Sequence, residues 1–259
     1  MTASSEYEAF APSKSLSSRI ARRVVKYRAQ RKLAFKHDKP IVSFSFDDCP
    51  RSVMETALPL LENRNWRGTI YAAMGLCGTT NHLGLHMSRE DMKAVHKAGH
   101  HVDGHTYSHV SARSVSTQDF LTDIEQNKAV FSELGLPSPR TFAYPYGEVT
   151  LETKRALSRK FPLLRGIHSP HGATSLDLNQ TASQRLYSGS DFEPCLEAIE
   201  NLKHTPIWLI LFTHDVRENP SAFGCTPSDF EKVVKAVETS GAEVLPVSEA
   251  LTKLQGALS

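Results

Sequence analysis

The chain has 259 residues, of which 40% are hydrophobic and 22% are charged, enough to bury the core of one barrel-sized domain or of two smaller ones. The longest strongly apolar run covers residues 207–212, far short of the roughly 20 residues that a membrane-spanning helix needs. No apolar segment follows the N-terminal charges as in a signal peptide, so we expect a cytoplasmic protein without a transmembrane segment.

The N-terminal segment carries most of the basic charge. Residues 1–39 contain ten Lys and Arg against three acidic residues, about +7, which leaves about −5 for the rest of a chain whose net charge is +2. Apolar residues recur there at helical spacing and predict a basic amphipathic helix. We expect its apolar stripe to pack on the domain or on a second subunit; contact with a membrane surface or a polyanion is the alternative. The stripe consists of Leu16, Ile20, Val24 and Tyr27.

From residue 40 onward, short β-like segments alternate with helical patterns, which is typical of parallel β/α units. This alternation predicts one closed or nearly closed β/α barrel at residues 40–259, preceded by a basic helical extension at residues 1–39. The expected strands are 41–46, 69–73, 101–104, 141–143, 163–166, 185–187, 207–212 and 243–246. The expected helices are 53–63, 89–97, 117–134, 151–160, 192–202 and 228–240, with Ser88 and Thr117 as N-caps.

Two familiar ligand classes have no sequence signature. Neither a Gly-x-Gly-x-x-Gly loop nor a Walker-type loop is present, which disfavours nucleotide binding, and we expect no nucleic-acid partner. The four cysteines form no Cys-x-x-Cys pair, so we expect reduced thiols rather than a disulfide framework or a zinc knuckle. They are Cys49, Cys77, Cys195 and Cys225.

Polar and aromatic groups follow four of the expected strands. Residues 47–48 follow the first strand, residues 105–109 the third, residues 144–147 the fourth and residues 214–215 the penultimate one. Functional groups of a parallel barrel lie beyond the C-terminal ends of its strands. We therefore expect these four segments to meet at one face of the barrel.

A carboxylate and two imidazoles in this set suit a metal. His105 and His109 are four residues apart, so one helical turn would place both rings on the same side. Either Asp47 or Asp48 could join them while the other stays free as a base; a strand-end turn is the alternative for the aspartate pair. Two His and one Asp leave open metal positions for water and substrate, as in a catalytic site. The same four-residue interval separates His82 from His86, His96 from His100 and His101 from His105.

Two other groups suit acyl-transfer chemistry. His214 could be a general acid, or a rim histidine hydrogen-bonded to Asp215. Residues 144–147 predict a rigid aromatic turn that could present a backbone N–H and a ring to a sugar, or else pack over the barrel mouth.

These segments, in this order, resemble the polysaccharide deacetylase family, which is carbohydrate esterase family 4 with the nodulation-factor deacetylase homology domain. The resemblance covers roughly residues 40–250, and its first two motifs together are specific. The four matching segments are Ser-Phe-Asp-Asp-Cys-Pro at 45–50, His-Thr-Tyr-Ser-His at 105–109, Phe-Ala-Tyr-Pro-Tyr-Gly at 142–147 and Leu-Phe-Thr-His-Asp at 211–215.

The resemblance implies a distorted (β/α)7-8 barrel with a divalent metal, usually zinc, bound by Asp48, His105 and His109. It implies that Asp47 is the general base and His214 the general acid. The backbone N–H of Tyr146 would then bind the oxyanion together with the metal. The third motif as a whole, Tyr144, Pro145 and Tyr146, is expected to bind substrate.

The substrate implied by the resemblance is an N-acetylated glycan. We expect removal of N-acetyl groups from an N-acetylglucosamine-containing polysaccharide, such as an exopolysaccharide or a biofilm adhesin of the holdfast or poly-N-acetylglucosamine type. One alternative is a hydrolase of the same fold acting on xylan, a lipid-linked aminosugar or a small molecule. The other is an inactive barrel that binds a glycan or a polyanion.

Three positions depart from the family pattern. Ala143 stands where the third motif often has the arginine that orients the base, and we expect Arg165, after the next strand, to supply that cation. Cys49 stands where glycine is usual, so a turn with positive φ would be strained. The remaining family motif is not recognisable around residues 168–171.

Overall fold

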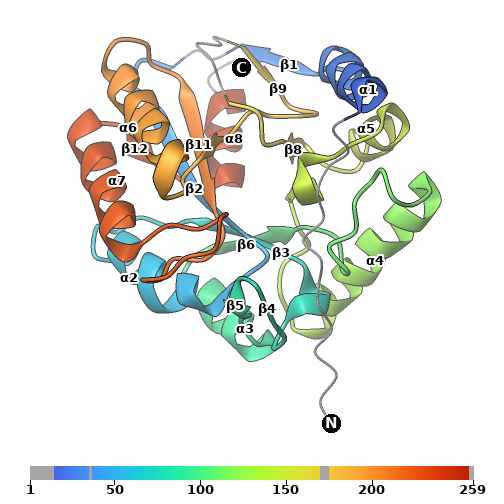
Figure 1. Cartoon of the computed structure of the whole chain (residues 1–259), viewed down its shortest axis with the longest axis horizontal. Coiled ribbons are helices and arrows are strands. Elements are labelled where there is room, and N and C mark those ends of the chain that lie inside the picture. The colour runs from blue at the N-terminus through green and yellow to red at the C-terminus, as the bar shows by residue number, and fades with distance from the viewer. Residues whose placement is uncertain (1–14, 35–36, 170–174, 257–259) are drawn as a thin grey trace.

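A computed structural model describes residues 15–34, 37–169 and 175–256 (Figure 1). Strands occupy the centre of the molecule and helices surround them. Among the described residues, no helix combines the length and the apolar character needed to cross a membrane.

The central sheet is parallel and curls into a distorted barrel. Seven strands pair in the order β10-β11-β2-β3-β6-β7-β8, and β12 pairs with the first two residues of β2. All eight strands lie where the alternating pattern predicts them, so the predicted barrel is confirmed. Their bounds are β2 Ile41–Asp47, β3 Thr69–Ala72, β6 His101–Gly104, β7 Thr141–Ala143, β8 Leu163–Arg165, β10 Gln184–Arg185, β11 Trp208–Thr213 and β12 Glu243–Val244.

Irregular chain joins the two edges of this sheet. The segment that precedes β10 runs beside β8, where Gly166 N donates to the carbonyl oxygen of Thr181 at 2.8 Å. Ser183 N donates to the carbonyl oxygen of His168 at 3.0 Å. These bonds close the barrel where regular strand pairing stops.

Six predicted helices are present, and the C-terminal α8 was not predicted. Ser88 caps α3 as expected, but α4 is capped by Ser116 rather than Thr117, because the Ser116 hydroxyl accepts from the backbone N–H of Asp119. The bounds are α2 Leu58–Glu62 after a π-turn at Val53–Ala57, α3 Arg89–Lys97, α4 Thr117–Glu133, α5 Leu151–Leu157, α6 Phe192–Glu200, α7 Pro227–Ser240 and α8 Val247–Gly256. A small hairpin, β4 Thr80–Asn81 with β5 Gly84–Leu85, precedes α3.

The central strand β2 separates the outer core from the barrel interior. Side chains alternate along a strand, and Phe44 and Phe46 pack outward on Phe230 of α7, with ring centroids 5.8 and 6.0 Å away. The alternate residues Ser45 and Asp47 are polar and also buried. This alternation places the Asp47 carboxylate inside the barrel mouth.

The N-terminal helix α1 (Leu16–Tyr27) is followed by β1 (Lys32–Ala34), which pairs antiparallel with β9 (Ser175–Asp177). The helix itself was predicted, whereas β1 was not. The domain boundary at residue 39 stays a prediction.

The expectation that the apolar stripe of α1 packs on the domain is wrong. Among the residues of this helix whose burial the structure describes, only Val25 is buried, at 6% exposure. The stripe lies on the opposite side, with exposures of 72% for Leu16, 55% for Ile20, 48% for Val24 and 62% for Tyr27. The spacing predicted the helix correctly, but it cannot show which of two apolar faces meets the protein.

Candidate active site

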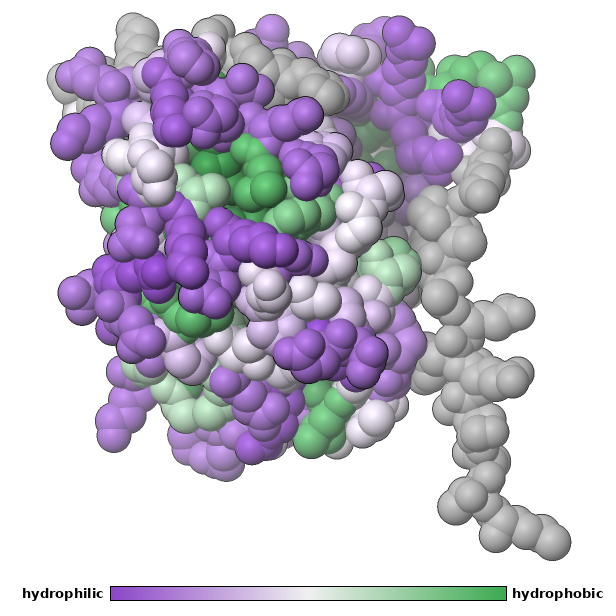
Figure 2. All heavy atoms as spheres, turned by 60° about the vertical axis from the view of Figure 1, so that its left-hand side comes forward, coloured by the Kyte–Doolittle hydropathy of each residue, from purple (hydrophilic) through white to green (hydrophobic). Residues whose placement is uncertain are grey.

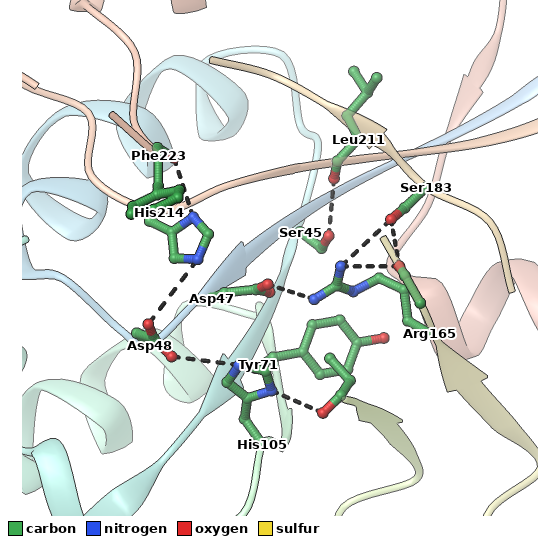
Figure 3. A network of polar contacts seen from close by, with 12 residues as sticks. Ser45, Asp47, Asp48, Tyr71, His105, Arg165, Ser183, Leu211, His214 and Phe223 are labelled. Atoms are coloured by element: carbon green, nitrogen blue, oxygen red, sulfur yellow. Dashed lines mark hydrogen bonds and ion pairs between the residues drawn. The ribbon is translucent and has the colours of Figure 1, made fainter. Parts of the chain in front are cut away.

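Asp47 and Arg165 form a buried ion pair across the barrel mouth. Asp47 ends β2 and Arg165 ends β8, and Arg165 Nη2 donates to Asp47 Oδ2 at 2.5 Å. Figure 3 shows the guanidinium directed at the carboxylate from the opposite strand. The other oxygen, Asp47 Oδ1, is buried and has no hydrogen-bond partner among the described residues. It is therefore available to accept a proton or a hydrogen bond from a bound molecule.

The Arg165 guanidinium is held on several sides. Its Cζ lies 5.1 Å from the ring centroid of Tyr71 and 4.8 Å from that of Phe212. Nη1 donates to the Gly166 carbonyl at 3.3 Å and to the Ser183 hydroxyl at 3.4 Å. Ring faces and carbonyls offset part of the cost of burying a cation, which is otherwise several kcal/mol. The guanidinium is thus fixed before any substrate arrives.

Asp48, His105 and His109 form a cluster of metal-ligand type. One ligand atom from each lies within 4.8 Å of the others. Asp48 Oδ1 is 3.3 Å from His105 Nε2 and 3.1 Å from His109 Nε2, and it is buried without a hydrogen-bond partner among the described residues. An unpaired buried carboxylate oxygen facing two imidazole nitrogens fits a divalent cation.

The charges of this cluster also fit a cation. Burial by itself would raise the pKa of Asp48, but the charge interactions with His109 and His105 outweigh it and lower the pKa. Burial lowers the pKa of His109 to about 4. At neutral pH the group therefore contains a carboxylate and a neutral His109, the protonation state that metal binding requires.

The remaining ring nitrogens orient the two histidines. His105 Nδ1 donates to the Ala143 carbonyl at 2.8 Å, so in the neutral ring Nε2 carries the lone pair and faces Asp48. His109 Nδ1 is hydrogen-bonded to the Tyr146 hydroxyl at 3.0 Å. Such outer contacts fix ring orientation in metal sites.

The two histidines do not share a helical turn, contrary to the sequence-based expectation. The segment 105–109 is irregular, and both Thr106 and His109 have positive φ, 61° and 53°. Asp123 of α4 holds it, because its Oδ1 accepts from the backbone N–H of Tyr107 at 2.6 Å and of Ser108 at 3.0 Å. A tight loop, rather than helix periodicity, brings the rings to a centroid distance of 4.9 Å.

Backbone strain is concentrated at this site. Of the seven non-glycine residues with positive φ in the described part of the chain, five lie here. Such conformations cost about 1–3 kcal/mol each and persist where the surroundings enforce them. The five are Asp48, Cys49, Thr106, His109 and Tyr146.

Cys49 is fully buried and has φ of 58°, as a glycine-like position would require. Burial raises the pKa of its thiol well above the ordinary value. The side chain therefore stays a neutral thiol packed in the core.

His214 directly follows β11 and faces Asp48. Its Nδ1 donates to the Phe223 carbonyl at 3.0 Å, and Nε2 lies 4.0 Å from Asp48 Oδ2. The rings of Tyr187 and Phe223 flank the imidazole at 5.9 and 5.8 Å. Figure 3 shows Asp48 in contact with both His214 and His105, with Asp47 beside them.

Asp215 is not the partner of His214, although the sequence suggested it. Its carboxylate accepts from Arg217 Nε at 2.8 Å and from the backbone N–H of Ser221 at 2.8 Å. Asp215 therefore stabilises the loop that brings the Phe223 carbonyl to His214.

The aromatic turn contributes less surface than expected. Tyr144 and Pro145 are buried, and the Tyr144 hydroxyl donates to the Asn179 carbonyl at 3.1 Å. These two side chains are therefore part of the core, and their contact with substrate stays a prediction. Tyr146 is half-exposed and has φ of 58°.

Some site residues escaped the sequence analysis. Tyr71 and Phe212 occupy strand positions that read only as core, and Ser183 and Phe223 lie in irregular segments without a motif. His168 is half-buried and its burial lowers the pKa to about 4. His171, considered with it, lies outside the described residues.

The fold and the site define a barrel of hydrolase type, with a carboxylate and two histidines at its mouth. The family model for polysaccharide deacetylase matches residues 35–163, about half of the chain. The chain belongs to the polysaccharide deacetylase family, which is carbohydrate esterase family 4.

A curated relative is the putative polysaccharide deacetylase YxkH of Bacillus subtilis, 25% identical over 170 residues that cover 64% of this chain. The chain spans 59% of the length of that relative.

Solved structures share the fold. A chitin deacetylase from Colletotrichum lindemuthianum superposes with a TM-score of 0.59 at 17% identity, covering 84% of this chain and 89% of that one. A family 4 acetyl xylan esterase from Clostridium thermocellum, in complex with a cobalt ion, gives a TM-score of 0.60 at 17% identity and covers 83% and 92%.

Proposed function

We propose that this protein is a metal-dependent N-deacetylase acting on an N-acetylglucosamine-containing polysaccharide, such as an exopolysaccharide or adhesin. The observation that carries the proposal is the arrangement around Asp48. Asp47, a buried carboxylate paired with Arg165, precedes Asp48 of the Asp-His-His cluster directly in the chain, and His214, fixed by a backbone carbonyl, faces Asp48 at 4.0 Å. A binding protein would have no need of a base and an acid beside a metal site.

Asp48, His105 and His109 would hold the metal, which we propose to be zinc because two imidazoles and one carboxylate suit it. When bound, it would polarise the amide carbonyl and lower the pKa of water at the site. The cluster has one carboxylate and two neutral ligands, so a divalent ion keeps a net positive charge there. That charge favours a nearby anionic base.

Asp47 would remove the proton from the attacking water. Its Oδ1 has no hydrogen-bond partner among the described residues, while Oδ2 is held by Arg165. One oxygen is thus free for the proton and the other fixes the carboxylate in place. The Arg165 guanidinium also places a positive charge beside this carboxylate.

His214 would protonate the departing nitrogen. Because its Nδ1–H is donated to the Phe223 carbonyl, Nε2 is the atom that faces the cluster and exchanges the proton. The backbone N–H of Tyr146 would donate to the oxyanion, which we base on the position of its turn above His109. The products are acetate and a free amine.

The experiment measures acetate release from N-acetylglucosamine oligomers by zinc-loaded protein, with acetylated xylan as the second substrate. The two solved relatives named above, a chitin deacetylase and an acetyl xylan esterase, motivate the pair. We expect release from the oligomers that is abolished by chelation, by His105→Ala and by Asp47→Asn. Acetate release from xylan alone would mean that the substrate is an ester rather than an amide. Glycan binding without acetate release, with the same affinity in Asp47→Asn, would mean that the protein binds glycan and is not an enzyme.

A further inference from the structure

Helix α1 presents its apolar stripe away from the barrel. Leu16, Ile20, Val24 and Tyr27 follow one another at intervals of four, four and three residues, so they lie on one side of the helix. All four are exposed, whereas Val25 on the opposite side is buried against the barrel. At the upper right of Figure 2, where α1 lies, hydrophobic side chains project next to strongly hydrophilic ones. The face of the molecule that Figure 2 brings forward is mainly hydrophilic.

Cations border this stripe. Arg19 and Arg23 are exposed on the helix, and Arg28 is exposed at its C-terminal end. No acidic residue occurs between Lys14 and Lys36. The outward face of α1 is therefore apolar in the middle and basic at its edges.

The direction of this face is fixed by contacts on the inner side. Buried Lys154 donates to the Val25 carbonyl at 3.2 Å and to Asp177 Oδ2 at 2.8 Å. Arg22 Nη1 is 3.0 Å from Glu148 Oε1, next to the aromatic turn. The helix is thus attached to the barrel through the Val25 backbone and the Arg22 side chain, and the apolar stripe is left outward.

We infer that α1 docks the protein on an anionic lipid surface. The apolar stripe would enter the boundary between headgroups and acyl chains, and the bordering arginines would contact the lipid phosphates. An apolar stripe flanked by cations is the pattern of a helix lying in the plane of a membrane interface. The fixed attachment of α1 to the barrel would then set the orientation of the enzyme on the surface.

The charge pattern of α1 favours an anionic lipid surface over a second copy of the chain as its binding partner. In a symmetric dimer through this face, the arginines of one α1 would meet those of the other, since a two-fold interface uses the same patch twice. Like charges at an interface oppose association. Anionic headgroups complement the same residues.

This docking would bring the lipid surface close to the proposed active site. A cavity of about 480 Å³ lies between α1 and the aromatic turn, lined by Arg23 and Lys26 on the helix side and by Tyr146 and His168 on the other. The Tyr146 hydroxyl contacts His109 of the metal-ligand cluster. A substrate carried by the membrane could therefore reach the site along α1; this step rests on the proposed function, whereas the docking does not.

The test is co-sedimentation of the full metal-loaded chain with vesicles. Vesicles of phosphatidylcholine with one quarter phosphatidylglycerol are compared with pure phosphatidylcholine. We expect binding to the anionic vesicles that is at least about 10-fold tighter than to the neutral ones and that weakens as salt rises. Ile20→Ser with Val24→Ser, and separately Arg19→Glu with Arg23→Glu, should each lower binding by at least about 10-fold.

The matched control is Lys232→Glu with Lys235→Glu on α7, two lysines that are 59% and 62% exposed. This variant changes the net charge by the same amount as the arginine variant. Its loss of vesicle binding should be at most half of the loss seen in the arginine variant. Circular dichroism and the thermal midpoint check that each variant folds, and acetate release from soluble oligomers should be unchanged in the serine variant.

Three outcomes overturn the docking. Wild-type protein that does not bind anionic vesicles disproves it directly. Binding that the serine variant retains in full reduces the contact to charge alone, without insertion of the stripe. A wild-type dimer that the serine variant converts to a monomer, measured by light scattering, assigns the stripe to a second copy.

Discussion

Arg165 and Asp47 are separated by 118 residues along the chain, yet Arg165 Nη2 lies 2.5 Å from Asp47 Oδ2. The pair joins the ends of β8 and β2 across the barrel. At the strand end where the family often has an arginine, this chain has Ala143, whose carbonyl instead accepts from His105. The next strand along the sheet thus supplies the cation beside Asp47.

Replacing Arg165 by alanine should impair both stability and activity. The change leaves Asp47 buried without its cation, which costs about 3 kcal/mol in the free energy of unfolding. The proposed base also loses its orienting partner, and acetate release should fall about 100-fold with a shifted pH profile. Urea unfolding and initial rates measured across pH 5 to 9, roughly the range in which such bases titrate, check both effects.

A paired variant separates the two effects. Asp47→Asn with Arg165→Met removes both charges, so stability should recover while activity stays lost. Full activity and an unaltered pH profile in Arg165→Ala would disprove the assignment of Arg165 as the positioning residue.

Metal binding and catalysis should separate among the mouth residues. Asp48→Asn and His105→Ala should lose stoichiometric zinc, because each removes one ligand atom of the cluster. His214→Asn should retain one zinc per chain and lose activity, since its Nε2 lies 4.0 Å from Asp48 and outside the cluster. Metal content after dialysis and calorimetric zinc titration measure this. Loss of zinc from His214→Asn would add that residue to the ligands.

Tyr146 should act on the metal through His109. The Tyr146 hydroxyl is hydrogen-bonded to His109 Nδ1 at 3.0 Å, and loss of such an outer partner costs about 10-fold or more in metal affinity. Tyr146→Phe keeps the ring and removes this bond, so zinc affinity should drop while the thermal midpoint of the zinc-saturated protein changes little. Tyr107→Phe is the control, because the hydrogen bonds of Tyr107 with the described residues come from its backbone, whose N–H donates to Asp123 and whose carbonyl accepts from Gly75. Equal zinc affinities in both variants would contradict the expected role.

The strand pattern was predictable because burial imposes it. All seven residues of β2 are buried, and a strand buried on both faces reads as an apolar run whose end is easily seen. Because parallel strands end at one face, their final residues meet there, which is why the sequence could place Asp47, His105 and His214 together. The family motifs then distinguished their roles.

The connections between these residues were not predictable. His214 is fixed by the backbone carbonyl of Phe223. The loop from His105 to His109 depends on positive φ at Thr106 and His109, which no hydrophobic periodicity can indicate. A backbone carbonyl is present at every residue, so its use as a partner leaves no mark in the sequence. For the same reason Tyr144 resembled a ligand-binding aromatic although its ring lies in the core.

A methyl group at Gly224 should disturb His214 without touching it. A Cβ there would lie 2.5 Å from Asp215 Oδ1 and would also meet the Asp215 carbonyl, so the backbone next to Phe223 must shift. That shift moves the carbonyl that orients His214, and activity of Gly224→Ala should fall at least about 10-fold with zinc content unchanged. Gly256→Ala is the control, because a Cβ at Gly256 meets nothing within 4 Å. Full activity in Gly224→Ala would show that the Phe223 carbonyl does not position the acid.

His168 should make the folded protein less stable in acid. Burial lowers its pKa from the ordinary 6.5 to about 4, so the folded state resists the proton that the unfolded chain accepts. The stability from this residue is complete above pH 6.5 and is lost as the pH falls toward 4, by up to about 3 kcal/mol at 1.36 kcal/mol per pKa unit. In His168→Gln this loss is absent, so the difference in unfolding free energy between wild type and variant should change by that amount between pH 7 and pH 4. Metal release affects both proteins alike and cancels in the difference.

The exposed His204, changed to Gln, serves as the comparison and should leave the pH dependence as in wild type. A difference between wild type and His168→Gln that is constant across this pH range would mean that His168 titrates in the folded protein as it does in the unfolded chain.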